Sequence, residues 1–217
     1  MENTQEKYPN LISAEIVADS LNQFGERITT MKLVFPRFIL AELNTHRMFN
    51  RNSASSRAIP FKKMVKEVME RPFIPIAWQK DHKGMQGNDY FQSETGENVH
   101  KLVEGWLDAR NSAVQIATGL NNSNVTKQLC NRLLEPFMWH TVLVTATEWK
   151  NFFELRCPQY SIEPLIDGDN RVFKSKKDFL KELDYEPIYP DSDLDWLKIN
   201  KGQAEIHMMA LAEKIYD

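Results

Sequence analysis

Residues 45–60 read Thr45-His46-Arg47-Met48-Phe49-Asn50-Arg51-Asn52-Ser53-Ala54-Ser55-Ser56-Arg57-Ala58-Ile59-Pro60, so three Arg, one His, three Ser and two Asn share sixteen positions. Ser and Asn side chains hydrogen-bond to nearby backbone and favour turns, so we expect a loop here rather than a helix or a strand. Guanidinium groups, Ser hydroxyls and loop amides together have the chemistry of an oxyanion site. A solvated loop with arginine caps fits the same composition, and composition alone does not separate the two interpretations.

The segment before this loop has the pattern of a buried helix. Apolar residues at 35, 38, 39, 40 and 43 predict a helix over 35–44, with Pro36 in its first turn. Such a helix would deliver His46 and Arg47 to the loop. Upstream, alternating apolar residues predict strands at 13–19 and 27–35, joined by a turn at 22–26. A hairpin followed by a helix and then the polar loop is the simplest arrangement.

With the apolar spacing downstream of the loop, we expect an α+β domain in which helices surround a small antiparallel sheet. Helical spacing is present at 61–70, 97–120, 124–134, 148–156, 175–183 and 203–216. A run rich in β-branched and aromatic residues predicts a largely buried strand at 137–147. Between these elements, the polar residues 79–96 predict a long surface loop.

Composition bounds the class of protein. The 217 residues are 42% hydrophobic and 26% charged, which is ordinary for a globular domain. No apolar run approaches the roughly 18 residues that span a bilayer, and the polar first residues do not resemble a secretory signal, so we expect a cytoplasmic protein. The formal net charge of −3 argues against broad electrostatic binding to nucleic acid.

The sequence predicts no metal site. Cys130 and Cys157 are too few for a zinc site of four thiolates, and we expect both to be reduced and structural. The five His residues include no His-Glu-x-x-His spacing. Acidic residues between 182 and 195 suggest a cation site, but without calcium-loop spacing a solvated segment is the better interpretation. Neither a P-loop nor a Gly-x-Gly-x-x-Gly run is present, which disfavours kinases and Rossmann dehydrogenases.

Two motifs resemble those of the flavin-dependent thymidylate synthases, the ThyX family, and in particular its short bacteriophage members. The family motif reads Arg-His-Arg, seven residues, Ser, one residue, Arg. His46, Arg47, Ser55 and Arg57 keep that spacing, and Thr45 stands where the first Arg belongs. A second family pattern, Asn-Phe, two residues, Leu-Arg, is matched by residues 151–156. The matches occur in family order, about a hundred residues apart.

The resemblance implies a ThyX-like fold, a homotetramer with active sites between subunits, and reductive methylation of dUMP to dTMP. Methylenetetrahydrofolate would give the carbon, FAD would carry the hydride and NADPH would reduce FAD. The catalytic residue would be Arg156, which in the family contacts the uracil and stabilises the anion that activates C5. A fixed guanidinium beside a developing oxyanion does this by favouring the transition state over the ground state.

Site residues transfer from the family position by position, with no metal ligand among them. The implied dUMP contacts are Glu42, Thr45, Ser53, Ser55, Ser56, Arg57, Arg132 and Arg156. The implied FAD contacts are Thr45, His46, Arg47, Ser53, Thr145 and Asn151. Several positions depart from the family pattern, since Glu42 replaces a Gln, Ser53 a Glu and Thr45 an Arg.

These departures leave two alternatives open. A changed folate or flavin pocket is compatible with hydroxymethylation of dUMP, and loss of flavin would leave a non-catalytic nucleotide-binding module. The family pattern also assigns residues 1–156 and 202–217 to one nucleotide- and flavin-binding domain, with residues 157–201 as an insertion within it. The expected partners are small molecules and further copies of the chain, rather than nucleic acid or membrane.

Overall fold

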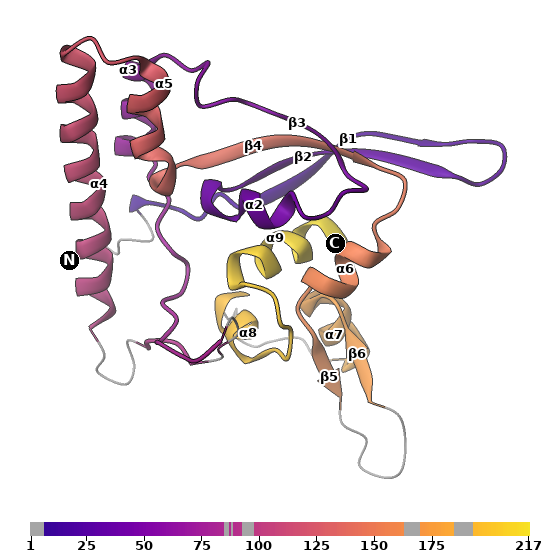
Figure 1. The fold of residues 1–217 in the computed structure, drawn as a ribbon. Coiled ribbons are helices and arrows are strands. Elements are labelled where there is room, and N and C mark those ends of the chain that lie inside the picture. Colours follow the sequence, from indigo (N-terminus) through magenta and orange to yellow (C-terminus); the bar gives the residue numbers. More distant parts are fainter. Residues whose placement is uncertain (1–6, 85–86, 88, 93–97, 163–169, 185–192) are drawn as a thin grey trace.

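The computed structural model describes residues 7–84, 87, 89–92, 98–162, 170–184 and 193–217. Helices surround a small antiparallel sheet, so the mixed fold class predicted from the sequence is confirmed (Figure 1). The sheet has the order β1-β2-β4-β3. Its strands are β1 (Ser13–Leu21), β2 (Arg27–Pro36), β3 (Asn50–Ser53) and β4 (Trp139–Ala146).

The core lies between one face of the sheet and a C-terminal helix. Leu33 of β2 pairs with Val142 of β4, and both side chains are buried. Helix α9 (Ile206–Tyr216) packs against this face (Figure 1). Nearly every side chain of this helix is buried, including those of Met208 and Leu211. This burial explains why the helix predicted at 203–216 forms, although it begins three residues later than expected.

The predicted hairpin is confirmed, but two neighbouring predictions are wrong. The β1–β2 turn is closed by Asn22, whose side chain accepts from the amide of Glu26. No long helix follows β2, because the strand continues to Pro36 and its ladder with β4 uses that backbone. Only a 3₁₀ turn and one α turn follow, η1 (Arg37–Ile39) and α2 (Leu40–Leu43). The polar loop also contains strand β3, because the free edge of β4 supplies partners for its backbone.

A second group of helices stands at one end of the sheet (Figure 1). Its elements are α3 (Phe61–Glu70), α4 (Val99–Asn122), α5 (Lys127–Cys130) and the 3₁₀ helix η3 (Asn131–Phe137). Met64, Ala117 and Leu134 form its buried core. The helix predicted over 124–134 is therefore split, because Asn124 has a positive φ of 61° and the helix begins only after Thr126, which caps it.

The remaining elements lie on the same side of the sheet as α9 (Figure 1). They are α6 (Lys150–Arg156), β5 (Tyr160–Ile162), β6 (Arg171–Phe173), α7 (Lys176–Glu182) and α8 (Asp193–Ile199). Rings of Tyr160, Phe179 and Trp196 pack together here. The limits of the insertion, 157–201, stay a prediction. Much of the predicted loop at 79–96 and of the acidic segment lies outside the described residues. Within the described residues, no helix has the length and apolar character needed to cross a membrane.

Candidate active site

One polar cluster joins both family-like motifs. Arg156, at the end of α6, forms an ion pair with Glu42 of α2. Its Nε donates to Nε2 of His46 at 2.9 Å, and its Nη2 lies 3.4 Å from the hydroxyl of Thr45. The side chains of Arg156 and Glu42 are 20% and 25% exposed, so the pair is partly buried but still reachable from the surface. The structure thus unites four predicted site residues.

Packing holds His46 in place. Its imidazole is buried against the rings of Phe49 and Phe152, at centroid distances of 5.7 and 4.9 Å. Nη1 of Arg51 donates to the carbonyl oxygen of His46 at 2.9 Å, which fixes the turn after α2. Arg51 therefore has a structural role here, although it belongs to the same arginine-rich stretch as Arg47.

The environment sets the charge of this cluster. Burial lowers the pKa of His46, and the nearby Arg156 and Arg51 lower it further. A neutral imidazole can accept the hydrogen bond from Arg156 through Nε2, with its proton on Nδ1. Burial raises the pKa of Glu42, because desolvation outweighs the attraction of Arg156, and the carboxylate of Glu205 adds to the rise. The ion pair thus holds a carboxylate that is less acidic than usual.

Two arginines outside this cluster line an open cleft of about 490 Å³ beside α2. Arg132 of η3 and Arg37 of η1 both face this cleft, together with Asn44 and Glu135. Nη1 of Arg37 donates to Nε2 of His140 at 3.0 Å, and its Nη2 lies 3.6 Å from Glu135. Two guanidinium groups in one cleft can bind a phosphate. Arg37 was not among the predicted site residues, and its one signal in the sequence is a cation directly after Pro36 in an otherwise apolar run.

The Ser-rich loop packs against α5 and against η3, the helix that carries Arg132. Ser56 is buried, and its hydroxyl donates to Oε1 of Glu135 at 2.6 Å. The amide of Asn131 donates to the carbonyl oxygen of Ser56 at 2.7 Å. Nε of Arg57 donates to Gln128 of α5 at 3.2 Å. These contacts place the loop next to η3, while Ser55 and Arg57 stay exposed.

The predicted flavin residues lie on separate elements. Thr45 and His46 belong to the Arg156 cluster, whereas Arg47 is exposed in the turn that follows. Ser53 ends the edge strand β3, and Asn151 is exposed at the start of α6. The hydroxyl of Thr145 on β4 is 2.8 Å from that of Thr30 on β2. The described residues contain no group of three or more His, Cys, Asp or Glu placed to hold a metal ion.

The fold is similar to that of solved structures. It is similar to the UMP/dUMP methylase PolB from Streptomyces cacaoi bound with 5-Br UMP, with a TM-score of 0.55 and 17% identity over 70% of this chain and 78% of that one. For the same methylase bound with 5-Br dUMP, the TM-score is 0.54 and the identity 15%, over 70% of this chain and 81% of the other. No family model and no curated protein matches the sequence. At these identities the likeness shows a similar fold and nothing more.

Proposed function

We propose that this protein methylates dUMP at C5 to form dTMP, as a flavin-dependent thymidylate synthase. The observation that carries the proposal is the cluster in which Arg156 meets Glu42, His46 and Thr45, on a fold similar to that of a UMP/dUMP methylase. Methylenetetrahydrofolate would supply the carbon, and NADPH the reducing equivalents. The cleft lined by Arg37 and Arg132 would take the phosphate of dUMP.

Arg156 would act on the uracil ring. Charge develops on the ring oxygens as C5 becomes a nucleophile, and a guanidinium held beside them stabilises that charge. His46 positions the guanidinium by accepting from its Nε, and a neutral imidazole does so without repelling it. Glu42 competes with the substrate for Nη1 of Arg156, so dUMP must displace or share this ion pair.

Donors for FAD are present on the surface near this cluster. Arg47 and Asn151 are exposed, and no hydrogen bond engages either side chain within the described part of the chain. Their chemistry fits the diphosphate and the polar ring edge of FAD, and the hydroxyls of Thr45, Ser53 and Thr145 would add further contacts. When bound, FAD would supply the hydride that turns the transferred carbon into a methyl group. By the same resemblance we propose a homotetramer.

One observation favours a second candidate, a nucleotide-binding module without catalysis. All three nitrogens of the Arg156 guanidinium have partners within the chain, which leaves the group engaged before any substrate arrives. A module of this kind would bind dUMP through the arginine cleft and leave C5 unchanged.

A tritium-release assay separates the candidates. Protein incubated with [5-³H]dUMP, methylenetetrahydrofolate, FAD and NADPH should release tritium and form dTMP. Arg156→Lys should lower the rate about 100-fold or more, because a lysine lacks the planar fork. Arg171→Lys is the matched control, since Arg171 forms an exposed ion pair on β6. Formation of 5-hydroxymethyl-dUMP would identify the hydroxymethylase instead. Bound dUMP with no tritium release would support the module, and no dUMP binding would refute both proposals.

A further inference from the structure

The cleft that Arg37 and Arg132 line also contains an acidic side chain, that of Glu135. Among the described residues of the lining, Glu135 is the one carboxylate, and the two arginines are the only cations. The cleft therefore presents two positive charges and one negative charge to a ligand. Because a carboxylate repels phosphate, Glu135 affects which phosphate chains can bind beside the two guanidinium groups.

Contacts on two sides hold the Glu135 carboxylate in place. Its Oε1 accepts from the hydroxyl of the buried Ser56 at 2.6 Å and lies 3.6 Å from Nη2 of Arg37. The side chain of Glu135 is 25% exposed, so a ligand in the cleft can approach it. A mobile surface carboxylate would swing away from an incoming anion, whereas the hydrogen bond from Ser56 keeps this one at the cleft.

The arrangement of the helices sets the direction in which a nucleotide would lie. On one side, Glu42 of α2 pairs with Arg156 of α6, and on the other side η1 packs against η3. Arg132 and Glu135 are three residues apart on η3, and side chains at this spacing share one face of a 3₁₀ helix. With the uracil at Arg156 and its phosphate at Arg132, a longer phosphate chain would continue along η3 towards Glu135.

We propose that Glu135 makes the cleft selective for nucleoside monophosphates over diphosphates and triphosphates. This inference rests on the proposed function, in which the cleft holds the phosphate of dUMP. One phosphate engages both guanidinium groups. A second phosphate finds no further cation in the described lining and adds negative charge close to the carboxylate. The selectivity thus comes from a repulsive group that rejects the longer chain.

Calorimetry with dUMP and dUDP tests the proposal, in buffer free of Mg²⁺ because the metal would neutralise the second phosphate. Wild-type protein should bind dUMP at least about tenfold more tightly than dUDP. Glu135→Gln keeps the size of the side chain and an oxygen that can accept from Ser56, but it removes the charge. This variant should raise the affinity for dUDP relative to dUMP by about tenfold.

Glu70→Gln is the matched control. It removes the same charge from α3, where Glu70 forms an exposed ion pair with Lys66, and should keep the wild-type preference. Equal wild-type affinities for the two nucleotides, or an unchanged preference in folded Glu135→Gln, would overturn the role of Glu135 and leave the dUMP site standing. No binding of dUMP to the wild type would refute the proposed function and this inference with it. If Glu135→Gln does not fold, Glu135→Met removes the charge at similar length, and the same criteria apply to it.

Discussion

At the scale of single residues, the ion pair between Glu42 and Arg156 should limit substrate affinity. The pair is partly buried, and in the proposed function dUMP competes with it. We expect Glu42→Gln to tighten dUMP binding about tenfold by calorimetry, because the amide holds Arg156 less strongly than a carboxylate does. Glu182→Gln, which alters an exposed ion pair with Arg171, should leave affinity unchanged. Weaker binding by Glu42→Gln would instead show that the carboxylate itself contacts the nucleotide.

The two arginines of the cleft should recognise phosphate. Arg37→Ala and Arg132→Ala should each weaken dUMP binding by about 1.5 to 3 kcal/mol, the range for charge-assisted hydrogen bonds. Deoxyuridine has no phosphate, so its affinity should be the same for the variants and the wild type. An equal loss for both ligands would indicate a general disturbance of the site, and no loss for dUMP would remove the phosphate assignment.

His140 should make stability depend on pH. Burial and the neighbouring Arg37 lower its pKa from 6.5 to about 4, so the unfolded chain takes up this proton first as the pH falls. The stabilisation is complete above pH 6.5 and is lost between pH 6.5 and 4, by roughly 2 to 3 kcal/mol. Urea unfolding across this range should show a shallower pH dependence for His140→Gln. The exposed His100→Gln should match the wild type, and identical slopes in all three proteins would contradict the assignment.

At the scale of elements, η3 connects core packing to the cleft that Arg37 and Arg132 line. Leu134 is fully buried against α3 and α4, whereas the adjacent Leu133 is 41% exposed. Leu134→Ala should lower the free energy of unfolding by about 2 to 5 kcal/mol, and Leu133→Ala by well under about 1 kcal/mol. Chemical denaturation measures both. Equal losses would show that η3 is not anchored by this side chain.

At the scale of the whole molecule, the β1–β2 hairpin extends beyond the rest of the fold (Figure 1). It exposes Ile16, Leu21 and Phe24, the last by 79%, and apolar side chains gathered on a surface mark interaction sites. Light scattering should give four times the chain mass of 25.3 kDa. Phe24→Asp should reduce that mass, and Ile199→Asp, exposed on α8, should not. A monomeric wild-type protein would contradict the proposed tetramer.

The sequence pattern alone predicted the elements whose structure depends on residues close together in the chain. The β1–β2 hairpin, α3 and α4 were predicted because their periodicity and turn residues act over a few positions. The family resemblance also pointed to Glu42, Thr45, His46 and Arg156, which the fold brings together. Their roles in binding dUMP and FAD stay predictions. These four residues meet because they lie at or near the ends of α2 and α6, whose packing is set by their apolar residues.

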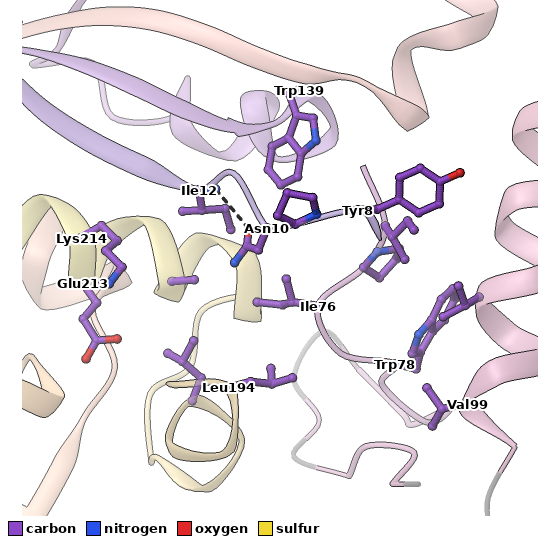
Figure 2. Close-up of a pocket in the computed structure, with 16 residues that line it drawn as sticks. Tyr8, Asn10, Ile12, Ile76, Trp78, Val99, Trp139, Leu194, Glu213 and Lys214 are labelled. Atoms are coloured by element: carbon purple, nitrogen blue, oxygen red, sulfur yellow. Dashed lines mark hydrogen bonds between the residues drawn. The ribbon is translucent and has the colours of Figure 1, made fainter. Parts of the chain in front are cut away.

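Tertiary structure alone decided the rest. Residues 36 and 50–53 are strand because β4 offers them backbone partners, and those partners are about a hundred positions away in the chain. Arg37 joins Arg132 only through the contact of η1 with η3, which periodicity cannot show. A cavity of about 420 Å³, whose lining includes Tyr8, Trp139 and Lys214, has walls from segments at both ends of the chain (Figure 2). Each of these features depends on contacts between residues distant in sequence, and such contacts leave no mark on the local pattern.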